Sequence, residues 1–424
     1  MFTKYEYGRI GEQCYREKLD NGLSLVVVPK KDFNRSLAFL SVNYGGADRR
    51  YKLNGQWIDT PSGVAHFLEH KAFELEGGED AMTAMTKRGA NVNAFTSSEM
   101  TAYHFDCIDG FFDNLETLIG FVTQPHFTEE SVEREKGIIA QEIKMSEDDP
   151  DHVVYYGLLR GLFKKHPIKD PVVGTAESIS EITAELLRSC HSSFYVPSNM
   201  TLVTVGDRDP IEVRDRAERL FSKNYSEAPA REAYKEKQEP AKKLVSSDME
   251  VSERLFLAGA KTKSNLKGEE AVRFNLTAAL SLNALLSEAS PLYSELYSEG
   301  LVNETFSYDF ESANGVSFFS FGGEAERAEE VVDRVIKEAE RLSGGIDRAY
   351  FARRKKAAAG DELRALNSFD NLAYNLALGA SGGYDYFNAA SIMKDISEED
   401  VCGFLKTWLT PERLTLSVIN RKER

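Results

Sequence analysis

A charged, proline-containing stretch near the middle of the chain divides it into two halves. Residues 224–243 read NYSEAPAREAYKEKQEPAKK and contain almost no large apolar side chain, which is typical of an exposed linker between packed units. A chain of 424 residues is long enough to form a separate core on each side of such a linker. We predict a first domain over 1–228, a linker over 229–244 and a second domain over 245–424.

The first half carries both strand and helix signals. Runs of β-branched and aromatic residues predict strands over 22–29, 36–44 and, as one long strand, 92–106. Helical periodicity predicts helices over 63–73, 79–88, 110–123, 129–147 and 151–163. Ser62 and Thr128 stand where N-caps belong, before the first and the fourth of these helices.

The second half repeats this inventory loosely, with a strand over 255–261, a helix over 270–286, a hairpin over 305–321 and a final strand over 414–419. The basic run over 353–356 is interpreted as a solvated helix face. Neither half shows βαβ regularity or a G-x-G-x-x-G motif. We therefore predict an α+β fold of two similar α/β-sandwich domains, each a mostly antiparallel sheet packed with helices.

The charge balance excludes some classes of function. The chain has 52 Lys and Arg against 68 Asp and Glu, a formal net charge of −16, which argues against a nucleic-acid-binding protein. No targeting signal and no apolar run long enough to cross a bilayer is found, so we expect a cytoplasmic protein without a membrane segment. The four cysteines form no C-x-x-C pair and are expected to be free thiols; they are Cys14, Cys107, Cys190 and Cys402.

The sequence His66-Phe-Leu-Glu-His70 carries the strongest chemical signal. On a helix, His66 and His70 are four residues apart, so both imidazoles project from one face and one small cation can bridge them. Glu69 lies beside that site, close enough to reach a water bound to the metal. Imidazole and carboxylate ligands suit Zn²⁺. The alternative is a chance pair of polar surface histidines.

A third ligand has to come from another segment, and the acidic helix over 129–147 offers Glu133, Glu135 and Glu142. Glu135 and Glu142 are seven residues apart and therefore share one face. One of them can bind the metal while the other orients a histidine. A solvated acidic face explains the same spacing equally well.

These residues resemble the signature of a known family. H-x-x-E-H followed by a distant glutamate resembles the inverted zincins, the pitrilysin/insulinase-type metallopeptidases that include the mitochondrial processing peptidases. Glu142 follows His70 by 72 positions, as the pattern of that family requires. Residues 89–103 resemble its G-x-x-x-N-A-x-T strand, and residues 194–200 resemble its F-Y-x-P-x-N-M segment. The resemblance is specific over about residues 20–210 and only of general type beyond them.

The resemblance implies a zinc endopeptidase that hydrolyses peptides or unfolded segments. It implies that His66, His70 and Glu142 bind one Zn²⁺ per chain, that Glu69 is the general base and that Glu135 is an acid that supports a ligand. In this scheme Glu69 takes a proton from the attacking water and returns it to the leaving amine.

The resemblance also implies a peptide-binding strand. Asn93, Ala94, Phe95 and Thr96 are expected to form an exposed edge strand to which an extended peptide adds through its main chain. The alternative is that these residues form an interior strand of the sheet.

One departure from the family pattern concerns the second half. Active relatives carry there an Arg and a Tyr seven residues apart that hold the substrate. The matching positions of this chain are Leu296 and Asn303. We therefore expect a heterodimer in which a homologous partner chain supplies the Arg and Tyr pair and helps to enclose a chamber; a homodimer stays possible.

Two alternatives remain open at this point. The chain can be a metal-binding but poorly active or non-catalytic subunit of a heterodimeric peptidase. It can also be a zinc hydrolase of non-peptide amides, which the peptide-like strand disfavours.

Overall fold

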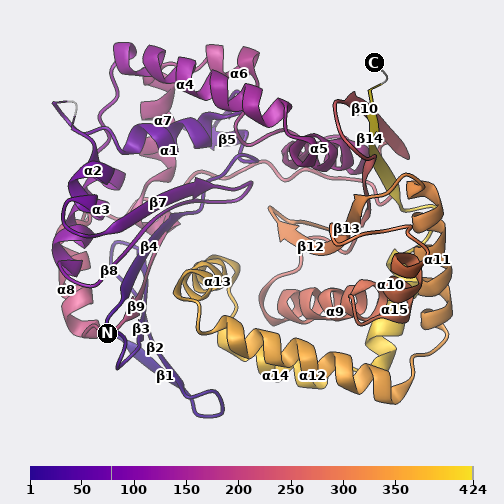
Figure 1. The fold of residues 1–424 in the computed structure, drawn as a ribbon. Helices are drawn as coiled ribbons and strands as arrows, with labels where there is room; N and C mark the ends of the chain where they lie inside the picture. Colours follow the sequence, from indigo (N-terminus) through magenta and orange to yellow (C-terminus); the bar gives the residue numbers. More distant parts are fainter. Residues whose placement is uncertain (78, 423–424) are drawn as a thin grey trace. The chain divides into compact units, whose positions relative to one another are not determined.

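The chain forms two compact units in the computed structural model, which describes residues 1–77 and 79–422 (Figure 1). Unit 1 contains Met1–Ile143, Pro171–Ala233 and Ala365–Phe387. Unit 2 contains Lys144–Asp170, Tyr234–Arg364 and the chain from Asn388 onward. Each unit combines a sheet with helices, so the predicted α+β fold of two similar sandwich domains is confirmed.

Unit 1 is built on a seven-stranded sheet with the strand order β1-β2-β3-β9-β4-β8-β7. All neighbours are antiparallel except β3 and β9. The strands are β1 (Thr3–Tyr7), β2 (Glu12–Lys18), β3 (Ser24–Pro29), β4 (Ser36–Val42), β7 (Asn91–Thr96), β8 (Thr101–Cys107) and β9 (Met200–Gly206), and a separate hairpin consists of β5 (Arg50–Leu53) and β6 (Gln56–Asp59).

The helices of unit 1 place the candidate site on one side of this sheet. Helix α1 follows the β5–β6 hairpin, and α4 carries the acidic residues singled out above. The helices are α1 (Val64–Ala72), α2 (Ala81–Thr86), α3 (Phe111–Thr123), α4 (Glu129–Glu147), α6 (Ala176–Ser180), α7 (Ala184–Phe194), α8 (Pro210–Leu220) and α13 (Phe369–Gly382).

Unit 2 is built on a five-stranded sheet with the order β10-β14-β11-β13-β12. Its strands are β10 (Leu244–Met249), β11 (Leu255–Lys261), β12 (Ser307–Ala313), β13 (Val316–Glu324) and β14 (Thr415–Arg421). Its helices are α5 (Pro150–Leu162), α9 (Gly268–Leu286), α10 (Pro291–Ser298), α11 (Ala328–Ser343), α12 (Arg348–Ala365), α14 (Ala389–Asp395) and α15 (Glu398–Trp408).

The two sheets share one topology. The order β3-β9-β4-β8-β7 in unit 1 corresponds to β10-β14-β11-β13-β12 in unit 2. In both sheets the first of these pairs is parallel and the other three are antiparallel. Strand β12 thus corresponds to the edge strand β7. Along the chain, α9 comes after β11 as α1 comes after β4, and α12 comes after β13 as α4 comes after β8.

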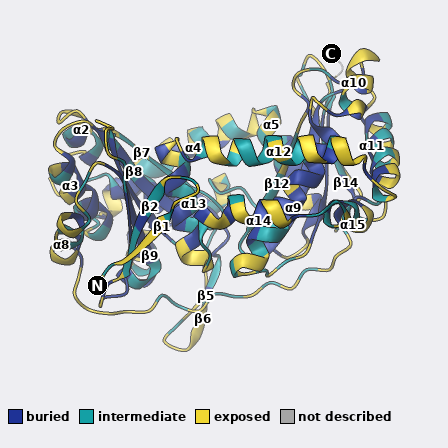
Figure 2. Cartoon of the chain, turned by 90° about the horizontal axis from the view of Figure 1, so that it is seen from below, coloured by how far each residue is buried: buried dark blue, intermediate teal, exposed yellow. Residues whose placement is uncertain are grey.

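A helix from the opposite half of the sequence covers the second face of each sheet. In unit 1, α13 packs Leu372 and Leu376 against Val26 and Val203 of the sheet. In unit 2, α5 packs Leu158 against the sheet. Central strands are therefore buried on both faces, which explains why every residue of β4 and of β9 is buried and why strands inside the sheets are dark blue in Figure 2. The compact units thus differ from the predicted linear domains by these exchanged segments, while their boundary at residues 233 and 234 lies inside the predicted linker.

Three local predictions are wrong. The predicted strand over 92–106 is a hairpin of β7 and β8, because the Ser97 hydroxyl accepts the backbone N–H groups of Glu99 and Met100 and closes a turn. The predicted cap Ser62 makes no cap bond, since α1 begins after Gly63 in a left-handed conformation. The basic run is only partly solvated: Arg353 is exposed, whereas Arg354 is half-buried.

Other predictions hold. The side chain of Thr128 accepts the N–H of Ser131 at the start of α4, as an N-cap does. Asn314 and Gly315 both have positive φ and close the β12–β13 hairpin. All four cysteines are free. Within the described residues, no helix combines the length and apolar character that crossing a bilayer requires.

Candidate metal and catalytic site

A glycine turn and an apolar face position α1. Gly63 has φ of 90°, and a Cβ atom there would lie 2.8 Å from the carbonyl oxygen of Val173, so only glycine fits. Phe67 and Leu68 are fully buried in the core of unit 1. These contacts hold the helix in one orientation, with His66 and His70 on a shared side.

The two histidines converge on Glu142 of α4. His66 Nε2 lies 3.4 Å from Glu142 Oε1, and His70 Nε2 lies 3.5 Å from Glu142 Oε2. One ligand atom from each of the three residues lies within 4.8 Å of the others. No second group of three or more His, Cys, Asp or Glu side chains that could hold a metal is found in the described chain. The hydrogen bond with His66 lowers the pKa of the Glu142 carboxyl and keeps it charged, against the effect of burial.

Glu135 holds the other side of His70. Its Oε1 lies 2.9 Å from His70 Nδ1. Glu135 precedes Glu142 by two helical turns on α4. Burial lowers the pKa of His70, but the hydrogen bond and charge of Glu135 outweigh it and raise that pKa overall. With Nδ1 bonded to Glu135, Nε2 of His70 is the nitrogen directed at Glu142.

Glu69 lies beside this cluster and is tied to strand β7. The Thr96 hydroxyl donates a hydrogen bond of 2.6 Å to Glu69 Oε2. Glu69 is only 9% exposed. Burial raises the pKa of its carboxyl, although the bond from Thr96 and the nearby imidazoles of His66 and His70 act in the opposite direction.

Strand β7 is the edge of the seven-stranded sheet, paired with β8 alone, so the alternative of an interior strand is wrong. Its side chains alternate between the faces. Ala94 packs in the core around α1, whereas Phe95 packs on the opposite face against Phe39 and Tyr374. Asn93 is exposed, and its Oδ1 accepts the N–H of Ala94.

The structure thus brings His66, His70, Glu142, Glu135 and Glu69 together in one cluster and adds Thr96 to it. The sequence reasoning missed the bond from Thr96 to Glu69. The alternation of Ala94 and Thr96 on the face of β7 toward α1 is the signal that predicts it. Glu133, the third acid considered on α4, instead pairs with Lys136 at 2.6 Å and is exposed.

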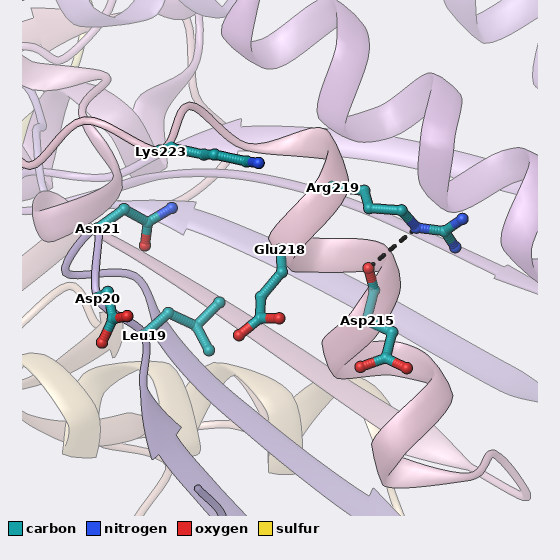
Figure 3. Close-up of a pocket in the computed structure, with 7 residues that line it drawn as sticks. All are labelled: Leu19, Asp20, Asn21, Asp215, Glu218, Arg219 and Lys223. Atoms are coloured by element: carbon teal, nitrogen blue, oxygen red, sulfur yellow. Dashed lines mark hydrogen bonds between the residues drawn. The ribbon is translucent and has the colours of Figure 1, made fainter.

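A cavity of about 810 Å³ in unit 1 lies away from these residues, between the turn after β2 and helix α8 (Figure 3). Its charged side chains include Asp20, Asp215 and Glu218, together with Arg219 and Lys223. The bond drawn there, from Arg219 Nε to the Asp215 carbonyl oxygen, lies within the helix itself. The cavity contains no residue of the metal cluster.

Comparison with known proteins identifies the family. Residues 55–176 match the family described as Insulinase (Peptidase family M16), and residues 181–358 match the Peptidase M16 inactive domain. The chain is 38% identical, over 98% of both chains, to a Bacillus subtilis (strain 168) protein named uncharacterized zinc protease YmfH. The chain belongs to the M16 peptidase family.

Solved structures agree with this assignment. An M16-like peptidase from Alicyclobacillus acidocaldarius superposes on the M16 chain with a TM-score of 0.93 and 30% identity, over 99% of this chain and 100% of that one. Pitrilysin superposes with a TM-score of 0.79 and 17% identity, over all of this chain and 47% of pitrilysin. The second likeness shows the fold alone. The predicted pitrilysin/insulinase-type family is therefore confirmed.

Proposed function

We propose that this M16 chain is a zinc-dependent endopeptidase that hydrolyses peptides or unfolded segments. The observation that carries the proposal is the convergence of His66, His70 and Glu142 beside the buried carboxylate of Glu69. The relatives named zinc proteases support the same class of reaction.

The donor set fits one zinc ion per chain. Two imidazole nitrogens and one carboxylate oxygen, all within 4.8 Å, are ligand types that catalytic zinc sites combine. Glu135 would hold the ring of His70 by accepting a hydrogen bond from Nδ1–H, which favours the tautomer whose Nε2 lone pair is available for the metal. Bound zinc would supply a Lewis acid that polarises the scissile carbonyl and makes water more acidic.

Glu69 is the proposed general base. Its carboxylate accepts a proton from the attacking water and delivers it to the leaving amine. A base with a raised pKa performs both steps at neutral pH better than an ordinary glutamate. Thr96 fixes one carboxylate oxygen, so the other faces the reacting water.

The edge of β7 is the proposed peptide site. Along Asn93, Ala94, Phe95 and Thr96, the main-chain groups that face away from β8 would pair with an extended substrate as an added strand, and the Ala94 N–H would exchange its bond to Asn93 Oδ1 for one to the substrate. Main-chain pairing makes few demands on side chains, which fits a peptidase acting on unfolded segments. A non-peptide amide would gain nothing from this edge.

A partner chain is also part of the proposal. Leu296 is fully buried in α10, and Asn303 is bonded to Glu324 at 2.9 Å and to Thr305. Neither position offers a charged or phenolic group to a substrate. We therefore retain the heterodimer, in which a homologous chain supplies the missing Arg and Tyr and helps to form a closed chamber, with a homodimer as the other arrangement.

The presence of Leu296 and Asn303 at the Arg and Tyr positions also favours a second candidate, a metal-binding subunit with little activity of its own. Cleavage of a fluorogenic peptide library separates the two, measured for the chain alone and with the candidate partner. Glu69→Gln should retain zinc and lose roughly 10²- to 10⁴-fold in rate, whereas the exposed Glu76→Gln should change neither. Unchanged cleavage by Glu69→Gln would refute the base assignment, and zinc binding with no cleavage under any condition would leave the second candidate.

A further inference from the structure

Arg354 of unit 2 is held in an unusual way for a residue of a basic surface run. It is half-buried on α12, and its Nε donates a hydrogen bond of 2.9 Å to Asn283 Oδ1 of α9. Asn283 Nδ2 in turn donates a bond of 2.9 Å to the Tyr308 hydroxyl oxygen of β12. The three side chains therefore link two helices to the edge strand of the five-stranded sheet.

The direction of these bonds is fixed by chemistry. A guanidinium can only donate, so the amide oxygen of Asn283 must face Arg354 and its NH₂ group must face Tyr308. The Tyr308 oxygen is thus used as an acceptor, and its own hydrogen remains available. Burial raises the pKa of Tyr308, against Asn283 and Arg354, so the hydroxyl keeps that hydrogen at neutral pH.

The groups left over in this cluster are all donors. No acceptor for Arg354 Nη1, Nη2 or the Tyr308 hydrogen is found among the described residues, and Arg354 forms no ion pair there. Neither Nη atom is among the buried polar atoms that lack a partner, so both reach solvent. A partly buried set of hydrogen-bond donors that lacks an acceptor is suited to binding a carboxylate ligand.

Neighbouring contacts hold the cluster in place. The Tyr350 hydroxyl donates a bond of 2.7 Å to the Ala284 carbonyl oxygen, which ties α12 to α9 beside Arg354. Lys355 binds the Ile396 carbonyl oxygen at 2.7 Å on the other side of the helix. Pre-positioned donors lose less entropy on binding than free side chains.

Two acids act on the same region. Glu288 and Asp361 lie within electrostatic range of the Tyr308 hydroxyl. Asp361 is paired with Arg364. Glu288 is exposed, and no ion pair of it is found in the described chain. Glu288 therefore opposes an incoming carboxylate without occupying the donors.

We propose that Arg354 and Tyr308, positioned by Asn283, form a carboxylate-binding site in unit 2 that holds a carboxylate of a peptide substrate. The chemistry admits two sources, the C-terminal carboxylate or an Asp or Glu side chain. The identity of the ligand as a peptide rests on the proposed peptidase function; the carboxylate site itself rests only on the arrangement of donors.

The first test uses acetate as the probe and requires no activity. Ligand-observed NMR of ¹³C-acetate with the full chain, stripped of zinc, should show binding that Arg354→Met weakens about tenfold and Tyr308→Phe weakens a few-fold. Arg353→Met is the matched control, because Arg353 is the exposed neighbour on the same helix, and it should bind acetate as the unsubstituted chain does. Glu288→Gln should strengthen binding.

Equal acetate binding by the Arg354→Met and Arg353→Met variants would overturn the site. If Arg354→Met fails to fold, as judged by circular dichroism, acetate binding is measured for Tyr308→Phe and Arg354→Lys instead, because both substitutions keep the approximate size of the side chain. Unchanged acetate binding in both would also overturn it.

The second test identifies the source of the carboxylate. Fluorescent peptides of one sequence without Asp or Glu, as free acid and as C-terminal amide, are titrated into the zinc-loaded Glu69→Gln chain, and a third peptide is an amide with one central Glu. A tenfold preference for the acid that Arg354→Met removes identifies the C-terminus; a preference for the Glu peptide alone identifies a side chain. Binding that Arg354→Met leaves unchanged for all three overturns the substrate role. If acetate binds but the unsubstituted, zinc-loaded chain cleaves no peptide alone or with its partner, the peptidase is refuted and the site stands; cleavage without acetate binding would refute the site alone.

Discussion

Units 1 and 2 place different chemistry on matching elements. In unit 1, α1 and α4 carry the histidines and carboxylates of the metal cluster, and the edge strand β7 carries Thr96. In unit 2 the corresponding α9, β12 and α12 carry Asn283, Tyr308 and Arg354. The first cluster offers lone pairs, and the second offers N–H and O–H groups.

In both units the shared arrangement of helices and edge strand sets where a ligand would bind, while the side chains set which charge that ligand must carry. Both clusters use a helix-to-helix link beside an unpaired strand edge. In unit 1 the carboxylates of Glu135 and Glu142 accumulate negative charge that a cation offsets. In unit 2 the guanidinium of Arg354 forms no ion pair with a carboxylate of the described residues, so an anion is the fitting ligand.

Removing the Glu142 carboxylate from the unit 1 cluster should give the largest effect. Glu142→Gln should weaken zinc binding by roughly 10²- to 10³-fold, since the loss of one of three protein ligands costs a few kcal/mol of binding free energy. The affinity is measured by competition with a chelator of known strength. Glu133→Gln is the control, because Glu133 lies on the same helix and pairs with Lys136. Equal affinities of the two variants would remove Glu142 from the site.

Two buried groups, one in each unit, should contribute to the pH dependence of stability with opposite signs. His191 of unit 1 is buried with Nε2 2.8 Å from the Val122 carbonyl oxygen, and burial lowers its pKa from 6.5 to about 4. The unfolded chain therefore takes up a proton near pH 6.5 that the folded chain takes up only near 4. The contribution of His191 to the stability of unit 1 therefore falls by up to about 3 kcal/mol as the pH falls through that window.

Glu311 of unit 2 acts in the other direction. Burial raises its pKa from 4.5 to about 7, against a hydrogen bond of 2.8 Å from Tyr155. The folded chain keeps a proton that the unfolded chain has lost, so unit 2 loses stability as the pH rises from 4.5 to 7. Hydrogen exchange of peptides from each unit, corrected for intrinsic rates, measures both slopes. His191→Gln and Glu311→Gln should each remove the contribution of that side chain from the slope of its unit; a slope that the substitution leaves unchanged would contradict the prediction for that residue.

The support of His70 by Glu135 distinguishes the unit 1 cluster further. Glu135→Ala should weaken zinc binding by about 10- to 100-fold, because His70 loses the partner that orients its ring. The same chelator competition measures it. Glu130→Ala, in the exposed first turn of α4, should leave the zinc affinity unchanged. If Glu135→Ala also leaves it unchanged, Glu135 does not orient His70 for metal binding.

The smallest expected effect concerns Thr96. Thr96→Val removes the hydroxyl that donates to Glu69 and should lower kcat about tenfold with little change in KM, since a hydrogen bond to a charged group contributes at least about 1.5 kcal/mol. Thr96→Ser keeps the donor and should restore most of kcat. A change in KM instead would indicate that Thr96 contacts the peptide, as the sequence alone suggests.

Much of the unit 1 site could be predicted from local pattern. The spacing of His66 and His70 and the periodicity of α4 depend only on neighbouring residues, and the family resemblance identifies Glu142. The β7–β8 turn could not be predicted, because Ser97 closes it with its side chain and no glycine or proline marks it. Gly63 instead of Ser62 is the N-cap of α1 for a related reason, since the contact with Val173 that demands glycine is distant in sequence.

The sequence by itself determined which residues share a helix face, where the chain divides and which ligands suit zinc, because these follow from spacing and side-chain chemistry. Only the tertiary structure decided how closely Glu135 and Glu142 approach the histidines and which sheet receives α5 or α13. It also decided that Arg354 is held by Asn283 with its outer nitrogens unused. Helix periodicity fixes a face relative to its own axis, and only packing against another element fixes what that face meets.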